Sequence, residues 1–308
     1  MADPVILLMG PTATGKTALA LELAERIGGE IVSVDSALVY RGMDIGTAKP
    51  SAADRARVPH HLIDIRDPEE SWSAADFALQ ARRLIDEIRD RGRIPLLVGG
   101  TMLYFRALVQ GLDDMPPVDP LVRAALRTRL SEVGADALHR ELLAVDPVSA
   151  GRIHPNDPQR ILRALEIHRS TGRPLSAFQS GSSRPLPPDW RCLALLPEDR
   201  ERLRQRIAQR FDAMLQAGFE RELRGLMQRP LLTATHASQR AVGYRQGWQW
   251  LSGAMSYDRF CERAITATRQ LAKRQLTWLR GATRFERIPA EGAHVDELLT
   301  RIRKVQDA

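Results

Sequence analysis

The 308-residue chain has few cysteines and no long apolar run. Its two cysteines, Cys192 and Cys261, lie far apart and show no metal-binding spacing, so we expect free thiols in a reducing compartment. No stretch approaches the roughly 20 apolar residues that cross a bilayer, and the first apolar run is too short for a signal peptide. These absences predict a cytoplasmic protein without a membrane segment, and the lack of an evident coiled coil favours a monomer.

Charge is distributed unevenly along the chain. Residues 1–150 contain 17 Lys or Arg and 22 Asp or Glu, a net charge of −5, whereas residues 151–288 contain 25 and 12, a net charge of +13. Arginine supplies nearly all of the positive charge in the second block, and its planar guanidinium pairs well with phosphate. A solvated arginine-rich surface and a nucleic-acid-binding surface both fit this pattern, so charge alone leaves the two alternatives open.

The most specific short motif covers residues 10–17, which match the phosphate-binding pattern G-x-x-x-x-G-K-[ST] without interruption. An apolar run precedes it at 5–9 and helix-forming residues follow it, which is the strand, loop and helix order that such sites require. Loop N–H groups, the helix N-terminus and the lysine would all face phosphate oxygens. The predicted diphosphate site consists of Gly10, Pro11, Thr12, Ala13, Thr14, Gly15, Lys16 and Thr17, with Thr17 as a ligand of Mg²⁺.

Strand-like and helix-like segments alternate over the first 114 residues. We expect strands at 5–9, 30–34, 61–65 and 93–98, with a helix at 73–90 before the last of them. This alternation is typical of a parallel α/β sheet with helices on its faces.

Two polar residues follow predicted strands and are, with Lys16, our catalytic candidates. Asp35 directly follows the strand at 30–34, and Thr101 follows the strand at 93–98 after two glycines. Ligands of parallel sheets lie beyond the carboxyl ends of strands, so both residues should converge with the phosphate loop. Asp35 could accept a proton from a nucleophile. Capping of a turn or a helix is the structural alternative for each residue.

The pattern becomes helical after residue 114. Helices are predicted throughout 120–173, and a Ser- and Pro-rich linker at 180–189 leads to a strand at 192–196. Further helices are predicted at 200–217, 238–251 and 257–280. We therefore predict an α/β core formed by 1–114 and 190–308, interrupted by a helical insertion domain at 115–189.

Three classes of protein fit the phosphate loop. A small-molecule kinase would need an adenine site, which the sequence does not reveal. A nucleotide-dependent switch would pair the loop with an apolar strand ending in an Mg²⁺-binding aspartate, but here that strand ends in Gly99-Gly100 and Asp64 is only a loose substitute. A transferase with a pyrophosphate leaving group needs a diphosphate cradle, a base at a strand end and a basic acceptor surface, and the sequence contains candidates for all three.

Longer segments carry a family resemblance. The run at 35–50 is highly specific by itself, and characteristic segments follow in order at 60–64, 98–104, 156–166, 240–246 and 273–280. Together with the loop they resemble the tRNA dimethylallyltransferase family, also called tRNA isopentenyltransferase. Thr14 stands where serine is common, which keeps the hydroxyl, and the zinc finger of the eukaryotic branch is absent, so the chain is similar to bacterial members.

The resemblance implies a P-loop NTPase-like core that holds pyrophosphate. The implied reaction moves a dimethylallyl group from dimethylallyl diphosphate to the exocyclic amine of adenosine 37 in tRNAs that read codons beginning with U. The target base would leave the anticodon-loop stack to reach the site, with Asp35 as the base for the amine.

The resemblance also implies contacts with the anticodon stem-loop of tRNA, several of them in the arginine-rich block. These residues are Asp35, Ser36, Ala37, Leu38, Thr101, Arg123, Gln159, Arg160, Ile161, Leu162, Arg163, Arg240, Ala241, Val242, Gly243, Tyr244, Arg245, Lys273, Arg274, Gln275, Leu276, Thr277, Trp278, Leu279 and Arg280.

Overall fold

The computed structural model describes residues 4–179, 185–282 and 285–304. The chain divides into two compact units, Met1–Val109 with Pro185–Ala308, and Gln110–Arg184. The divisions fall five residues before the predicted boundaries at 114/115 and 189/190. Part of the linker predicted at 180–189, residues 180–184, lies outside the described residues. Among the described helices, none is long and apolar enough to cross a membrane.

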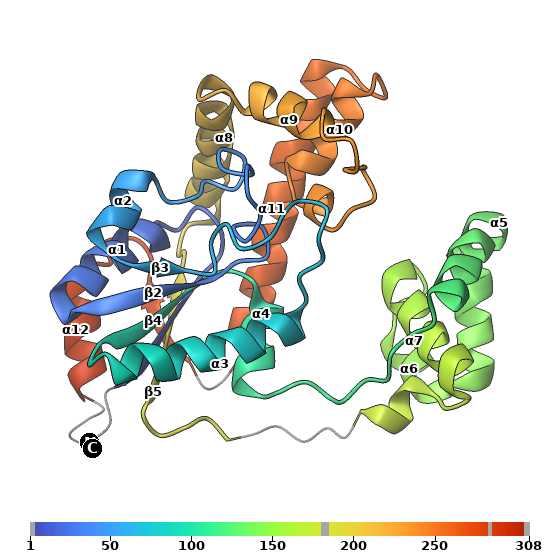
Figure 1. The fold of residues 1–308 in the computed structure, drawn as a ribbon, viewed down its shortest axis with the longest axis horizontal. Helices are drawn as coiled ribbons and strands as arrows, with labels where there is room; N and C mark the ends of the chain where they lie inside the picture. The colour runs from blue at the N-terminus through green and yellow to red at the C-terminus, as the bar shows by residue number, and fades with distance from the viewer. Residues whose placement is uncertain (1–3, 180–184, 283–284, 305–308) are drawn as a thin grey trace. The chain divides into compact units, whose positions relative to one another are not determined.

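The first unit is built on a six-stranded parallel sheet with the order β3-β2-β4-β1-β5-β6 (Figure 1). Its strands are β1 (Val5–Met9), β2 (Gly29–Val34), β3 (His60–His61), β4 (Ile94–Gly99), β5 (Trp190–Leu196) and β6 (Glu286–Pro289). Leu7 of β1 lies between Leu97 of β4 and Cys192 of β5. The order of the strands along the chain reverses beside β1, which is where open α/β sheets bind their ligands.

Helices cover both faces of this sheet. The helices of the first unit are α1 (Lys16–Ile27), α2 (Ala52–Arg57), α3 (Ala74–Asp90), α4 (Met102–Val109), α8 (Arg200–Gln216), α9 (Phe219–Met227), the 3₁₀ helix η2 (Ser238–Arg240), α10 (Tyr244–Leu251), α11 (Tyr257–Gly281) and α12 (Val295–Lys304). Alternate residues of β1 enter different cores. Leu7 packs in the core with Phe77 of α3, whereas Ile6 packs in the core with Leu23 of α1 and Leu298 of α12.

The second unit is helical, as the sequence predicts for this part of the chain. It contains α5 (Pro120–Val145), which kinks at Gly134, α6 (Pro147–Arg152), α7 (Pro158–Thr171) and the 3₁₀ helix η1 (Leu175–Phe178). Each α-helix begins with an Asp-Pro pair, in which the aspartate caps the first turn and the proline needs no N–H partner. The buried Leu138 and Ile161 belong to this unit's own core.

Two predicted elements are wrong in extent. The strand predicted at 61–65 is only His60–His61, because Leu62 and Asp64 have φ values of 61° and 56° that end the extended conformation. The helix predicted at 238–251 breaks between η2 and α10, where Gly243 has φ 91°. The sequence pattern also missed α2, α9, β6 and α12, none of which is longer than ten residues.

The pairing of β2 with β4 leaves no space for a side chain at Gly99, since an added Cβ would overlap the Val34 carbonyl group. We expect Gly99→Ala to lower the free energy of unfolding by about 3 kcal/mol or more, because the neighbour is backbone and cannot rotate away. Gly225→Ala, in an exposed turn of α9 with nothing near the added methyl, should instead raise it by about 1 kcal/mol. Urea unfolding of both variants checks the contrast; equal stabilities would contradict it.

Candidate active site

The phosphate loop leaves β1 at the carboxyl edge of the sheet. Gly10 N donates to Gly99 O at 3.3 Å, and a Cβ at Gly10 would lie 3.0 Å from the Leu195 carbonyl oxygen. Gly15 has φ 86° and caps α1, a fully described helix with no acidic residue in its first turn. The positive end of α1 is therefore not offset by its own side chains and suits an anion.

Two cations approach the loop. Lys16 Nζ donates to Pro11 O at 2.8 Å. Burial and then the charge of Arg210 lower the pKa of Lys16 to about 8, while Asp35 opposes the shift. Burial also lowers the pKa of Arg210, again opposed by Asp35. The two cations are poorly solvated and act on each other, so an anionic ligand would stabilise both.

Asp35 and Thr101 extend from the ends of neighbouring strands β2 and β4. Asp35 Oδ1 accepts hydrogen bonds from Ala37 N at 2.8 Å and Leu38 N at 3.4 Å, which fixes the carboxylate. Thr101 Oγ1 accepts from Ser36 N at 3.1 Å, so this side chain links the two strand ends. Val34 of β2 pairs with Gly99 of β4, and Gly99 O accepts from Gly10 N, so the strand end that carries Asp35 lies next to the start of the phosphate loop. The charge of Asp35 accordingly opposes the lowering of the pKa of both Lys16 and Arg210.

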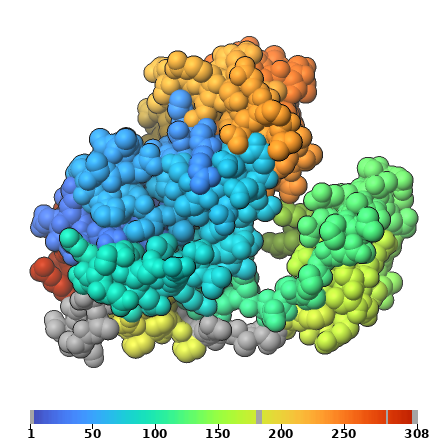
Figure 2. Space-filling view, viewed as in Figure 1, coloured from blue at the N-terminus to red at the C-terminus, as the bar shows by residue number. Residues whose placement is uncertain are grey.

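Glu222 of α9 anchors the segment 35–50, which begins with Asp35 at the end of β2. The Glu222 carboxylate accepts from Asp44 N at 2.8 Å, Ile45 N at 2.7 Å and Gly46 N at 3.1 Å. The Tyr244 hydroxyl donates to the same carboxylate at 2.6 Å, and its pKa is raised by burial and by the nearby negative charge. In Figure 2 the orange atoms of the α9–α10 region lie against blue atoms of the N-terminal part of the chain.

Lys49 anchors the other end of the segment. Its Nζ donates at 2.6 Å to both Asp44 Oδ1 and Asp64 Oδ1, and at 2.8 Å to Tyr40 O. Arg210 also reaches the segment, donating to Thr47 O at 3.3 Å. The segment is therefore held by contacts that include one of the two cations beside the loop.

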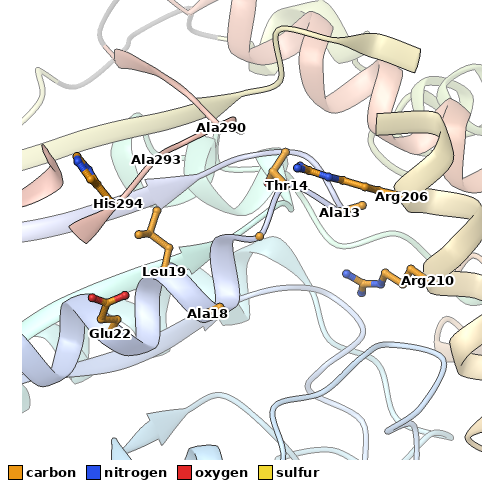
Figure 3. A pocket seen from close by; sticks show the side chains of 11 residues that line it. Ala13, Thr14, Ala18, Leu19, Glu22, Arg206, Arg210, Ala290, Ala293 and His294 are labelled. Atoms are coloured by element: carbon orange, nitrogen blue, oxygen red, sulfur yellow. The ribbon is translucent and has the colours of Figure 1, made fainter. Parts of the chain in front are cut away.

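A pocket of about 540 Å³ lies against the phosphate loop and the first turns of α1. Arg206 and Arg210 of α8 extend toward the loop from one side of the pocket, and His294 lies on the other (Figure 3). Small residues Ala18 and Ala290 contribute to its walls. Arg206, Arg210 and Glu22 line this pocket, whereas Lys16, Asp35 and Thr101 do not, so the pocket adjoins the phosphate loop without including the candidate catalytic residues.

The sequence did not single out Arg210 or Arg206. Helix α8 contains several arginines, and apolar periodicity places Leu203 and Ile207 in the core, so α8 reads as an ordinary amphipathic helix. The arginine-rich charge pattern was the available signal, but it does not distinguish Arg210 from the exposed arginines on the same helix.

The predicted tRNA contacts in the first unit divide into exposed and buried residues. On α11, Lys273, Arg274, Thr277 and Arg280 are exposed and recur at helical spacing along one face. The side chains of Gln275, Leu276 and Leu279 are buried, and Trp278 is half-buried.

The second predicted group in this unit surrounds the start of α10. Arg240 and Arg245 are exposed, Ala241 and Val242 are half-buried, and Gly243 and Tyr244 are buried. Any direct contact of the buried side chains with RNA would need them to move, whereas the two arginines are accessible as they stand.

The predicted contacts in the second unit lie on α5 and α7. Gln159 and Arg160 are exposed in the first turn of α7, Leu162 and Arg163 are half-buried, and Ile161 is in the core. Arg123 Nε lies 3.3 Å from Glu166 Oε1, so its guanidinium is held by an ion pair on the same unit.

The chain matches the IPP transferase family over residues 38–282. It is 58% identical over 279 residues to the tRNA dimethylallyltransferase of Bordetella avium, with 90% of this chain and 89% of that protein covered. It is 54% identical over 304 residues to the tRNA dimethylallyltransferase of Thioalkalivibrio sulfidiphilus, with 98% and 95% covered.

Solved structures agree with the sequence relatives. The tRNA isopentenylpyrophosphate transferase of Bacillus halodurans is similar with a TM-score of 0.70 and 36% identity, covering 99% of this chain and 98% of that one. A eukaryotic dimethylallyltransferase acting on tRNA is similar with a TM-score of 0.76 and 29% identity, covering 94% and 74%.

The parallel sheet and the glycine loop with its converging charges define an α/β protein of the P-loop type. The family match, which covers residues 38–282, identifies the class of P-loop protein to which this chain belongs. The chain belongs to the IPP transferase family and is a prenyltransferase.

The lowered pKa of Lys16 predicts a pH dependence of anion binding. Below pH 8 Lys16 is already protonated in the free protein. Above pH 8 a bound anion must draw a proton onto it, so affinity should fall by up to about tenfold per pH unit. Calorimetric titration with inorganic pyrophosphate between pH 6.5 and 9.5 measures this.

Lys16→Met is the matched control, because it keeps the length of the side chain and removes the titrating charge. The ratio of the two affinities cancels the ionisation of pyrophosphate itself. It should be constant below pH 7 and shrink above pH 8. A ratio that stays constant over the whole range would show that Lys16 does not titrate there.

Proposed function

We propose that this protein transfers the dimethylallyl group of dimethylallyl diphosphate to the exocyclic amine of adenosine 37 in tRNAs that read codons beginning with U. The products are isopentenyladenosine and pyrophosphate. The observation that carries the proposal is the convergence of Lys16, Arg210 and Asp35 at the phosphate loop. It combines a cradle for a diphosphate with a carboxylate that can accept a proton. Action in the cytoplasm as a monomer is part of the proposal and rests on sequence alone.

The phosphate loop would hold the leaving group. As the bond between the allylic carbon and its oxygen breaks, negative charge grows on pyrophosphate. The loop N–H groups other than Thr12 N, the N-terminus of α1, Lys16 and Arg210 would be the donors for that charge. The allyl unit spreads the opposite charge over its carbons, so stabilisation of the leaving group is the larger part of catalysis.

Mg²⁺ fits the proposed site through Thr17, whose exposed side chain lies in the first turn of α1. One protein hydroxyl with diphosphate oxygens and water is a common set of ligands for this ion. When bound, Mg²⁺ would supply further positive charge to the diphosphate.

Asp35 would accept the proton of the attacking amine. The amine nitrogen forms a bond to the allylic carbon and passes one proton to the carboxylate, which balances the charge that leaves with pyrophosphate. The bonds from Ala37 N and Leu38 N keep the carboxylate in one orientation. Thr101, whose hydroxyl accepts from Ser36 N, would contact the same substrate.

Each unit would contribute its own surface to tRNA binding. In the first unit this is the exposed face of α11 with Lys273 and Arg274, together with Arg240 and Arg245. In the second unit it is Arg160 in the first turn of α7. Such contacts reach phosphates and position the RNA, while the base is read in the site.

Asp35→Asn should slow the chemical step by about 10²–10⁴-fold, the usual effect of removing a general base. The amide keeps an oxygen for the Ala37 and Leu38 N–H groups. Pyrophosphate should bind equally well or more tightly, because a negative charge near the two cations is lost. Single-turnover transfer to an unmodified anticodon stem-loop and pyrophosphate titration measure the two effects. A rate close to that of the unsubstituted protein would refute the role of Asp35.

Arg274→Gln should reduce the salt dependence of stem-loop binding by about one unit in the log–log slope, since one phosphate contact is lost. Arg83→Gln on α3 is the control, because Arg83 is an equally exposed arginine paired only locally with Glu87. Its slope should not change. Filter binding across a salt series measures both variants. Equal slopes for all three proteins would show that the α11 face does not bind RNA phosphates.

A further inference from the structure

The side chain of Gln275 lies between the phosphate loop and the end of β4. Its Oε1 accepts a hydrogen bond from Thr12 N at 3.0 Å, and its Nε2 donates to Gly100 O at 2.7 Å. Gln275 is only 8% exposed, although its neighbours Lys273 and Arg274 on α11 are on the surface. The buried side chain of Gln275 thus connects α11 both to the phosphate loop and to Gly100, the residue before Thr101.

The two partners determine the orientation of the Gln275 amide. Thr12 N–H is a donor and can face only the oxygen, while Gly100 O is an acceptor and can face only the nitrogen. A side chain of this length with a donor at one position and an acceptor at the other is a carboxamide or a protonated carboxyl. The arrangement therefore depends on hydrogen-bonding character, beyond the volume that Gln275 fills.

The surroundings of Gln275 are fitted closely to it. A Cβ on Gly100 would lie 2.5 Å from the Gln275 nitrogen and 3.1 Å from Gly10 O, so only glycine leaves room for the amide. Gly10 itself donates to Gly99 O at 3.3 Å. The loop is therefore attached to the end of β4 both through its own backbone and through Gln275.

We propose that Gln275 is a positioning residue, which sets the distance between the diphosphate in the loop and the substrate at Thr101 and Asp35. It acts by fixing Thr12 against Gly100 and does not itself contact the reacting atoms. The inference rests on the proposed function, because it concerns how that diphosphate is placed. It also gives Gln275 a role different from the direct tRNA contact that the family resemblance implies.

Gln275→Met tests the proposal, because it preserves length and removes both hydrogen bonds. We expect the affinity for inorganic pyrophosphate and the single-turnover transfer rate each to fall by about tenfold or more, since small displacements of a reacting group are costly. Stem-loop affinity and its salt slope should stay within about twofold. Gln239→Met, at another fully buried glutamine that bonds Ser238 Oγ, is the control for lost packing and should retain pyrophosphate affinity.

Gln275→Glu separates hydrogen-bonding character from shape. The ionised carboxylate repels Gly100 O and adds negative charge at the loop, so pyrophosphate should bind far more weakly than to the unsubstituted protein at pH 8. As the pH falls through the pKa of the introduced carboxyl the difference should shrink, because the protonated carboxyl can again donate to Gly100 O. Gly100→Ala displaces the same amide from the opposite side and should mimic Gln275→Met.

The role of Gln275 and the proposed function would be overturned by different results. Pyrophosphate binding by Gln275→Met within twofold of the unsubstituted protein, or a pH-independent defect in Gln275→Glu, would overturn the role of Gln275. Failure of the unsubstituted protein to bind pyrophosphate would overturn the proposed function instead. If Gln275→Met does not fold, the pH dependence of Gln275→Glu and the affinity of Gly100→Ala decide the case.

Discussion

Two positive side chains, Lys16 and Arg210, are half-buried beside the phosphate loop, and the loss of solvation lowers the pKa of each. Their charges cost free energy in the absence of a ligand, and the nearby Asp35 offsets only part of that cost. In the proposed reaction these positive charges would stabilise the negative charge that develops on the leaving group. The sheet and the C-terminal helices hold these side chains and the phosphate loop in place.

The sheet and the C-terminal helices hold this site in different ways. The order of the strands places the ends of β1, β2 and β4 at one edge, so the loop, Asp35 and Thr101 meet there. Helices from the second half of the chain then fix the loops in place. Glu222 of α9 binds three N–H groups of the segment 35–50, and Gln275 of α11 ties Thr12 to Gly100. The proposed catalytic residues Lys16, Asp35 and Thr101 come from the first half of the chain, whereas Arg210 and much of the support come from the second.

This division explains what the sequence could predict. The loop, Asp35 and Thr101 follow strands, so local pattern and the geometry of parallel sheets locate them. Arg210 and Glu222 act through contacts with residues more than 150 positions away, and no local pattern marks them among similar residues. The family resemblance did include Gln275 in a predicted tRNA-contacting segment, but its bonds to the distant Thr12 and Gly100 were not predicted. The strand at 61–65 was predicted too long because the positive φ values of Leu62 and Asp64 depend on tertiary bonds, including Asp64 N to Leu38 O at 3.2 Å.

In the proposed reaction the two half-buried cations, Lys16 and Arg210, stabilise a diphosphate leaving group. The most direct measurement incubates the protein with unmodified anticodon stem-loop and dimethylallyl diphosphate labelled in the allyl group, and follows label and pyrophosphate together. One pyrophosphate should be released for each dimethylallyl group found on the exocyclic amine of adenosine 37. Hydrolysis of ATP at the loop with no label entering the RNA would contradict the proposed reaction.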